Sequence, residues 1–377
     1  MRIYLDNAAT TPIDKRVFEA MTPYLTELFG NPSSIHQYGR EIRSAVEQAR
    51  KKVADIFNVA PSEIFFTSGG TEADNTIINN AIYSLDIKHA ITSKIEHHAV
   101  LHTLQHMEEA GKITLHFVEL DRKGQVNYDS LENLLKSHKN AFVSLMHANN
   151  EIGNLLDLER VGDLCHENNA FFHSDTVQTL GHIDIDLSKI NIQSIAGSAH
   201  KFHGPKGVGL MYINADQKIP PLLIGGGQER NMRGGTENVS GIIGLAKALE
   251  LSYQEKEESH TKLLQFKKYT IEQLTSRFNN ISFNGLSADL EKSLNKVLSI
   301  SIPGIEDNDM LLFNLDINGI AISGGSACAS GTSIGSHVLD ALDLDQNLGT
   351  LRISFSKFNT KEEIDYFFKK LGEALKI

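Results

Sequence analysis

The chain has 377 residues, a length that predicts two domains. It contains 36 Lys and Arg against 47 Asp and Glu, and the resulting net charge of −11 argues against a nucleic acid or an anionic membrane as a direct partner, because both attract basic patches. The sequence lacks a secretory signal and any apolar run long enough for a membrane span. Its two cysteines, Cys165 and Cys328, form no CxxC motif or disulfide framework. We therefore expect a cytoplasmic protein.

Strands and helices are predicted to alternate through the first half of the chain. Apolar residues at helical spacing predict a helix within residues 36–58, and Ile64–Thr67 is predicted to be a buried strand followed by a helix that begins at Thr71. The next predicted strands are His89–Thr92, Leu115–Leu120, Ala141–Met146 and Ala170–His173, separated by helices at Ala99–Glu109, Asp129–Leu135 and Asp157–Asn168. This alternation predicts an α/β domain with a largely parallel sheet.

The second half of the chain has a different pattern. Residues 252–278 are charged, lack Pro and Gly, and predict one long helix that leaves the large domain. Beyond it we predict strands at Val297–Ile302 and Arg352–Phe355 and helices at Asp309–Leu315, Ser336–Leu342 and Lys361–Leu375. We therefore predict a large domain of residues 15–257 and a small α+β domain made of residues 1–14 and 258–377.

Polar and glycine-rich segments follow several predicted strands, where ligands bind in open α/β sheets. Ser68-Gly69-Gly70-Thr71 lies between a strand and a helix, so its backbone N–H groups could hold a phosphate, although a plain turn fits equally well. Lys201 lies between a polar turn and a Gly-Pro corner, and could form a Schiff base if burial lowers the pKa of its ammonium; most lysines are instead surface residues. Asp175 follows an apolar strand and could pair with a pyridinium nitrogen or cap a helix.

Taken together, these motifs occur in the chain order of fold-type I pyridoxal-phosphate (PLP) enzymes. Nine ordered blocks also resemble the group I cysteine desulfurases of the NifS/IscS type, in the class V aminotransferase family. The blocks are YLDNAATTP, FTSGGTEADN, TSKIEHHAV, NNEIG, HSDTVQT, GSAHKFHGPKGVG, GGGQERNMRGGTENV, SGGSACAS and LRISFS. The resemblance implies an α/β fold-type I PLP-dependent transferase, with a mostly parallel seven-stranded sheet in the large domain, a smaller α+β domain and a homodimeric assembly.

The resemblance implies a role for each matching residue. Lys201 would carry PLP covalently and act as a general base, Asp175 would pair with the pyridine nitrogen, Gln178 would contact the phenolic oxygen, and His97 would stack on the ring and assist proton transfer. The phosphate would be held by Gly70, Thr71, Ser198, His200 and, from the neighbouring subunit, Thr236. Asn150, also counted among the cofactor contacts, and Arg352 would bind the carboxylate of the substrate, L-cysteine.

Cys328 is the implied nucleophile, and the small residues around it suit a mobile loop. Its thiolate would take the substrate sulfur as a persulfide, leaving alanine, and a sulfur-acceptor or scaffold protein would receive that sulfur for iron–sulfur cluster assembly or tRNA thiolation. No metal is required, although Cys328 could transiently ligate an iron–sulfur cluster. Some relatives carry a longer C-terminal tail that docks the scaffold, so the short end of this sequence puts that partnership in question.

Other interpretations were weighed against this one. A selenocysteine lyase or another class V PLP enzyme would share the site, whereas Cys328 argues against a plain aminotransferase; a non-catalytic sulfur-relay protein would not need Lys201, Asp175 and Arg352 intact. The GxSxG sequence at residues 331–335 lacks the preceding strand of a hydrolase elbow. Cys165 is predicted to be a buried structural thiol, and the ladder of His98, His102 and His106 a solvated helical face rather than a metal site.

Overall fold

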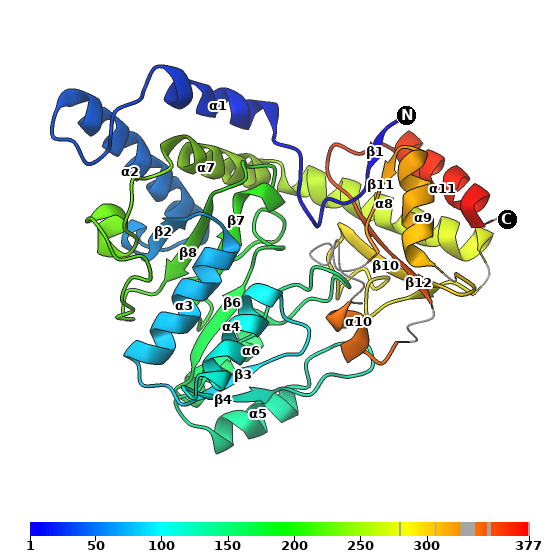
Figure 1. Ribbon diagram of the computed structural model, residues 1–377, viewed down its shortest axis with the longest axis horizontal. Helices are drawn as coiled ribbons and strands as arrows, with labels where there is room; N and C mark the ends of the chain where they lie inside the picture. Colours follow the sequence, from blue (N-terminus) through cyan, green and yellow to red (C-terminus); the bar gives the residue numbers. More distant parts are fainter. Residues whose placement is uncertain (279, 306, 325–335, 345–347, 376–377) are drawn as a thin grey trace.

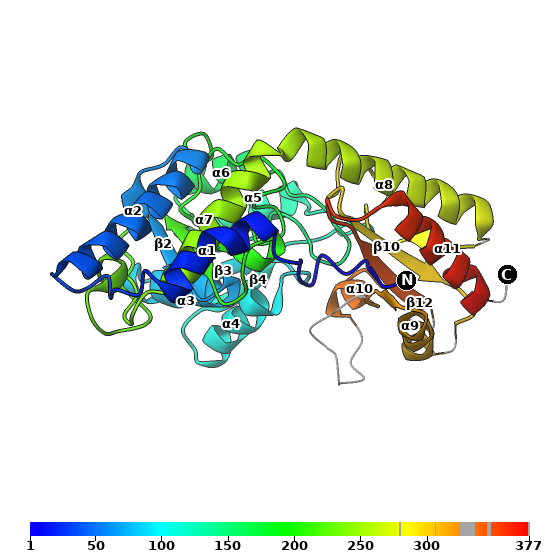
Figure 2. The ribbon, with the colours of Figure 1, turned by 90° about the horizontal axis from the view of Figure 1, so that it is seen from above.

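The chain folds into two lobes, which Figures 1 and 2 show side by side. The computed structural model describes residues 1–278, 280–305, 307–324, 336–344 and 348–375, so Cys328 and the GxSxG sequence lie outside the described residues. The larger lobe holds a sheet with helices on both faces. The smaller lobe is formed mainly by the C-terminal third of the chain, and the N-terminal strand β1 (Ile3–Tyr4) joins it.

The sheet of the larger lobe has seven strands in the order β2-β8-β7-β6-β5-β3-β4. Strand β8 pairs antiparallel with both of its neighbours, and every other pairing in this sheet is parallel, which confirms the predicted mostly parallel seven-stranded sheet. The strands are β2 (Ile64–Thr67), β3 (His89–Thr92), β4 (Thr114–Phe117), β5 (Phe142–Ser144), β6 (Phe171–Asp175), β7 (Ser194–Ser198) and β8 (Gly209–Ile213).

Helices cover both faces of this sheet because alternate strand residues on each face are apolar. The core on one face packs Phe65, Ala90 and Phe142 against α3 and α4, and the core on the other packs Phe66, Ile91 and Val143 against α2, α5, α6 and α7. The helices are α1 (Lys15–Thr26), α2 (Gln37–Phe57), α3 (Gly70–Ser84), α4 (His98–Glu109), α5 (Tyr128–Ser137), α6 (Leu158–Glu167) and α7 (Val239–Gln254), with short 3₁₀ turns η1 (Pro61–Glu63), η2 (Ala199–Lys201) and η3 (Gln228–Asn231).

The smaller lobe has its own apolar core, in which Leu298, Ile353 and Phe367 are buried. The smaller lobe contains an antiparallel sheet in the order β12-β10-β9 and the parallel pair β1-β11. Its elements are α8 (Lys256–Arg277), β9 (Ser282–Phe283), β10 (Val297–Ile302), α9 (Asn308–Ile317), β11 (Ile320–Ala321), α10 (His337–Ala341), β12 (Gly349–Ser354) and α11 (Lys361–Leu375). The domain boundaries at residues 15 and 257 stay a prediction.

One predicted element is wrong, because residues 252–278 do not form a single helix. Helix α7 ends at Gln254 and α8 begins at Lys256, with Glu255 between them at φ −99° and ψ 10°. The Glu255 carboxylate binds Arg16 and accepts a 2.7 Å hydrogen bond from Lys357 Nζ, so contacts with distant residues fix the bend. Within the described part of the chain, no helix is both long and apolar enough to cross a bilayer.

Candidate active site

The predicted site residues meet at one edge of the large sheet. Strands β2, β3, β5, β6 and β7 run parallel, so the loops after them share this edge, and β12 of the smaller lobe faces it. A cavity of about 550 Å³ opens there. Its lining includes Gly70, Thr71, His97, Asn150, Asp175, Gln178, Ser198, His200, Lys201 and Arg352.

The start of helix α3 lines one part of the cavity. Gly69 precedes the helix and offers no side-chain cap, so the first backbone N–H groups stay available to a ligand. A Cβ at residue 70 would lie 2.6 Å from Val177 Cγ2, so glycine lets the helix start approach the loop after β6. Ser198 also lines this cavity, as does His200, whose Nδ1 lies 3.0 Å from Thr10 Oγ1.

Asp175 ends strand β6 and is buried at the base of the cavity. Burial raises the pKa of its carboxyl to about 6, although the Val177 N–H, bonded at 2.8 Å, and the Lys201 charge favour the ionised form. A cationic ring nitrogen beside Asp175 would favour the carboxylate further. Asp74 lies fully buried on α3, where burial, then the charges of Asp175 and Glu96, raise the pKa of its own carboxyl.

Lys201 and Gln178 both contact the N-terminal segment. Lys201 Nζ donates to the carbonyl oxygens of Ala8 and Ala9 at 2.7 and 2.8 Å, and Gln178 Nε2 donates to the Ala8 oxygen at 2.9 Å. Gln178 Oε1 is buried with no hydrogen-bond partner among the described residues. An unpaired buried acceptor is unfavourable, so this oxygen is suited to a donor supplied by a ligand.

His97 is the N-cap residue of α4, the helix that follows strand β3, and it lines the cavity. Its Nδ1 accepts a 3.1 Å hydrogen bond from the Ala99 N–H, which places the proton of the neutral ring on Nε2. Burial, with smaller contributions from the Lys201 and His337 charges, lowers the pKa of His97 to about 4. The neutral ring is therefore the form present near pH 7, and its Nε2–H is available as a donor.

Arg352 brings a positive charge from strand β12 into the cavity. It is 1% exposed, and it donates from Nη2 to Asp6 Oδ1 at 2.7 Å and from Nη1 to the Asn150 carbonyl oxygen at 3.1 Å. Its Nε is buried and has no hydrogen-bond partner among the described residues. A guanidinium with an unused donor suits a small carboxylate ligand.

Two predicted site residues are not in this group. Thr236 lines a neighbouring hollow of about 110 Å³, which shares Ser68 and Gly207 with the cavity, and it is not among the residues that line the cavity itself. Cys328 lies outside the described residues. The structure does place the residues that follow its segment: His337 lines the cavity, and Ser336 Oγ donates to Glu151.

Sequence reasoning assigned no role to Asp74 and His173. His173 Nε2 lies 3.2 Å from Asp74 Oδ1, and both side chains are fully buried behind Asp175. Burial lowers the pKa of His173 to about 3, so its ring is neutral. The blocks FTSGGTEADN and HSDTVQT contain both residues, but only the fold shows that they meet.

Two further sequence interpretations can be compared with the structure, and one of them concerns His98, which also lines the cavity. Cys165 is completely buried in α6, as predicted, and burial raises the pKa of its thiol. The histidine ladder differs from its prediction, because His98 is only partly exposed: it stacks on His102 with ring centroids 4.4 Å apart, and its Nε2 lies 3.1 Å from His337 Nδ1. Contact with α10 of the smaller lobe, which periodicity cannot predict, explains the difference.

The residues present fit a phosphorylated pyridine. The uncapped start of α3 suits the phosphate, and the buried carboxylate of Asp175 suits a protonated ring nitrogen. Gln178 Oε1 could accept a hydrogen bond from a ligand, and Lys201 supplies an amine. These groups converge on one cavity of a size typical of cofactor sites.

Comparisons with known proteins point the same way. The family model described as Aminotransferase class-V matches residues 3–367. A cysteine desulfurase IscS from Dictyoglomus turgidum is 42% identical over 97% of this chain and 92% of its own. A solved structure titled NifS-like protein has a TM-score of 0.92 and 39% identity, and the match covers both chains completely. Another, titled SspA in complex with cysteine, has a TM-score of 0.82 and 31% identity over 96% of this chain and 100% of its own.

Proposed function

The chain belongs to the aminotransferase class-V family, and from that premise we propose that it is a PLP-dependent cysteine desulfurase that converts L-cysteine to L-alanine and transfers the sulfur to Cys328. The observation that carries the proposal is the convergence of Lys201, Asp175 and Arg352 with the start of α3 around one cavity. An amine, a ring-nitrogen partner, a carboxylate receptor and an anion site are the groups that PLP chemistry on an amino acid requires.

PLP, when bound, withdraws electrons from the amino acid attached to it. Lys201 would hold PLP through its side-chain amine, and the same amine, when free, would move the proton at Cα of the substrate. Arg352 and Asn150 hold the substrate carboxylate, which fixes Cα near Lys201. Asp175 would keep the ring nitrogen of the cofactor protonated, and the neutral His97 would lie against the ring with its Nε2–H available as a donor.

The sulfur step uses Cys328. Its thiolate attacks the substrate sulfur, the S–S bond forms as the Cβ–S bond breaks, and protonation of the carbon fragment yields alanine. L-cysteine and one thiol thus become L-alanine and one persulfide, with no external oxidant. A sulfur-acceptor or scaffold protein in the cytoplasm then reduces the persulfide and takes the sulfur for iron–sulfur cluster assembly or tRNA thiolation.

The experiment that tests this function compares wild type with Cys328→Ser, each purified with PLP and given L-cysteine and a thiol reductant. Wild type should release sulfide and alanine in equal amounts. Cys328→Ser should keep the PLP absorbance but lose at least about 100-fold in sulfide release, because a hydroxyl cannot carry persulfide sulfur. Equal sulfide release by the two proteins would contradict the Cys328 assignment. Release of selenide from L-selenocysteine by a wild-type protein that releases no sulfide from L-cysteine would favour a selenocysteine lyase.

The homodimer is also part of the proposal. Phe29, Ile35 and Ile224 are 75, 87 and 91% exposed, and we call them the apolar patch. Gln228 Nε2, on the loop that leads to Thr236, donates to Ser33 Oγ at 3.5 Å, so the apolar patch adjoins that loop. Exposed aromatic and aliphatic side chains of this kind are typical of an interface, and a second copy of the chain docked there would carry Thr236 to its partner's phosphate site.

A complementation experiment checks the shared site. Thr236→Val should bind PLP about 10- to 100-fold more weakly, because it loses one hydrogen bond to a charged phosphate. Mixed dimers of Thr236→Val with Lys201→Ala should regain activity, since the site that keeps Lys201 receives Thr236 from the other chain. No recovery after the subunits are shown to have exchanged would argue that Thr236 serves its own chain or no site.

A further inference from the structure

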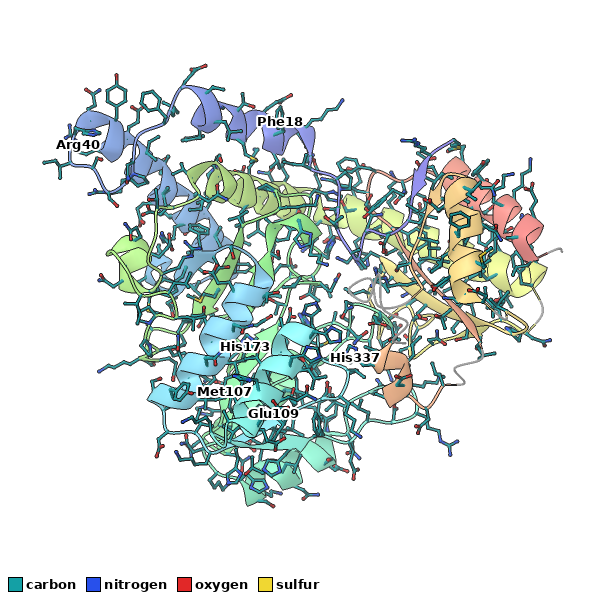
Figure 3. All side chains as sticks on the ribbon, viewed as in Figure 1. Phe18, Arg40, Met107, Glu109, His173 and His337 are labelled. Carbon is teal, nitrogen blue, oxygen red and sulfur yellow. The ribbon has the colours of Figure 1, made fainter. Side chains whose placement is uncertain are left out.

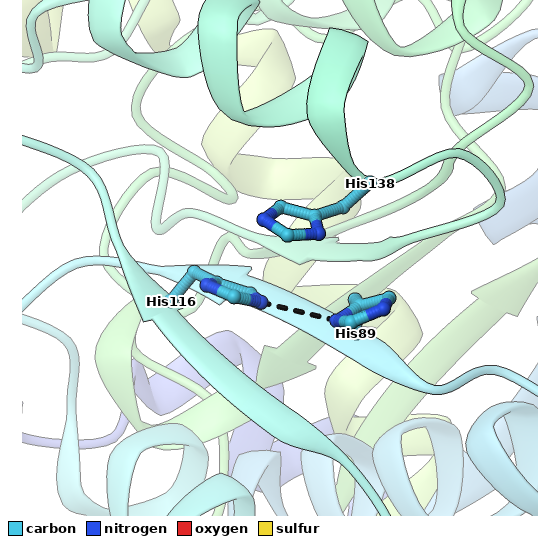
Figure 4. A group of neighbouring side chains, drawn as sticks. All are labelled: His89, His116 and His138. Atoms are coloured by element: carbon cyan, nitrogen blue, oxygen red, sulfur yellow. Dashed lines mark hydrogen bonds between the residues drawn. The ribbon is translucent and has the colours of Figure 1, made fainter.

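Three histidines cluster at the edge of the large sheet, away from the cavity described above (Figure 4). His89 opens β3, His116 lies on the neighbouring edge strand β4, and His138 follows the last turn of α5. In the parallel register His89 pairs with Thr114 and Ile91 with His116, so both strand histidines project from the sheet face that α5 covers. The fold thereby brings together three imidazoles from separate parts of the sequence.

The spacing of the rings is close to that of a metal site. One nitrogen from each ring can be chosen so that all three lie within 4.8 Å of one another. His89 Nδ1 and His116 Nε2 are 3.1 Å apart and share a hydrogen bond, and the His138 ring stacks on His116 at a centroid distance of 4.0 Å and lies tilted against His89 at 4.4 Å. Tetrahedral Zn²⁺ with Zn–N distances of about 2.0–2.1 Å separates its nitrogens by about 3.3 Å, so the rings would have to rotate from their present contacts to bring the three nitrogens to that spacing.

The three histidine side chains are partly buried, and each is also partly open to solvent. Partial exposure leaves one side open, where water can supply a fourth ligand.

We propose that His89, His116 and His138 form a binding site for a divalent transition-metal ion, with Zn²⁺ as the ion of choice. Three imidazoles and water suit Zn²⁺ better than Mg²⁺ or Ca²⁺, which prefer oxygen ligands. The bound ion would join β3, the edge strand β4 and the end of α5, and so stabilise this end of the sheet by binding the folded state. The site is independent of the sulfur chemistry.

Zinc binding by the PLP-loaded protein tests the site, in a Cys328→Ser background that removes the competing thiolate. After treatment with a chelator, equilibrium dialysis against ZnCl₂ should show one ion per chain and a raised melting temperature. His138→Ala should weaken binding at least about 100-fold, since even outer-shell changes cost 10- to 100-fold. Co²⁺ in place of Zn²⁺ should give visible d–d bands of tetrahedral nitrogen and oxygen coordination, and His138→Ala should lose them.

The matched control is His106→Ala, which removes an exposed histidine from α4 on the other face of the sheet and should bind zinc like its parent. His89→Gln provides a second ligand variant, and circular dichroism without metal verifies that each variant is folded. Unchanged zinc affinity in both His138→Ala and His89→Gln would overturn the proposal. So would loss of the bound ion on His98→Gln, because that would place the metal at His98 and His337.

Discussion

Lys201→Ala is expected to leave a folded protein that lacks the absorbance of lysine-bound PLP and releases sulfide at least about 10³-fold more slowly than wild type. The variant loses both the covalent attachment of the cofactor and the base at Cα, and general acid–base catalysis alone contributes about 10²–10⁴-fold. The phosphate and ring contacts proposed for the start of α3 and for Asp175 would remain, so added PLP should still bind, although reversibly. Absorbance spectra and sulfide assays on the two proteins measure both effects.

Two other lysines provide a demanding control for this prediction. Burial lowers the pKa of Lys267 to about 7, and burial together with the Lys201 and Arg352 charges lowers that of Lys296 well below its usual value, so both could offer a neutral amine. Neither lines the cavity that Lys201, Asp175 and Arg352 share. Reduction of the wild-type protein with borohydride, followed by peptide mapping, should therefore find the cofactor mass on the Lys201 peptide. The same mass on a peptide of Lys296 or Lys267 would refute the assignment.

Strand-end residues explain why much of the candidate site was predictable from the sequence. Asp175 and Ser198 end parallel strands β6 and β7, and the SGGT turn follows β2, so the rule that loops at carboxyl ends share one edge brings them together. The N-terminal wall at Ala8 and Ala9 and the Asp74–His173 pair depend on how distant segments pack. Nothing local in the sequence reports such contacts.

Two features of the fold show why local patterns failed. Helix α7 was not predicted, because Gly241 and Gly244 weaken its helical pattern. A Cβ at Gly244 would lie 2.6 Å from Met21 Sδ, so the glycine allows α1 to pack closely against α7. The bend at Glu255 has no Pro or Gly to mark it. It arises from the Arg16 and Lys357 side chains, which lie far away in the sequence.

Arg50→Leu is expected to destabilise the larger lobe by about 3–5 kcal/mol, because it leaves a buried carboxylate without its counter-charge. Arg50 is 2% exposed and binds Glu229 through two hydrogen bonds of 2.7 and 2.9 Å, and Nη1 also donates to the Ile64 carbonyl oxygen at 2.8 Å. Glu229 has a φ of 43° and also accepts the Phe66 N–H, so the pair fixes η3 against β2. Guanidinium unfolding followed by circular dichroism measures the loss.

A second variant and an exposed pair separate buried charge from mere truncation. Arg50→Leu combined with Glu229→Gln should recover part of the loss, since the amide still accepts the Phe66 N–H but carries no charge. Lys136→Met breaks the exposed pair with Glu132 and should cost less than about 0.5 kcal/mol. Equal losses for Arg50→Leu with and without Glu229→Gln would contradict the charge argument. Because η3 leads into the Thr236 loop, Arg50→Leu should also weaken PLP binding in the proposed dimer, whereas Lys136→Met should not.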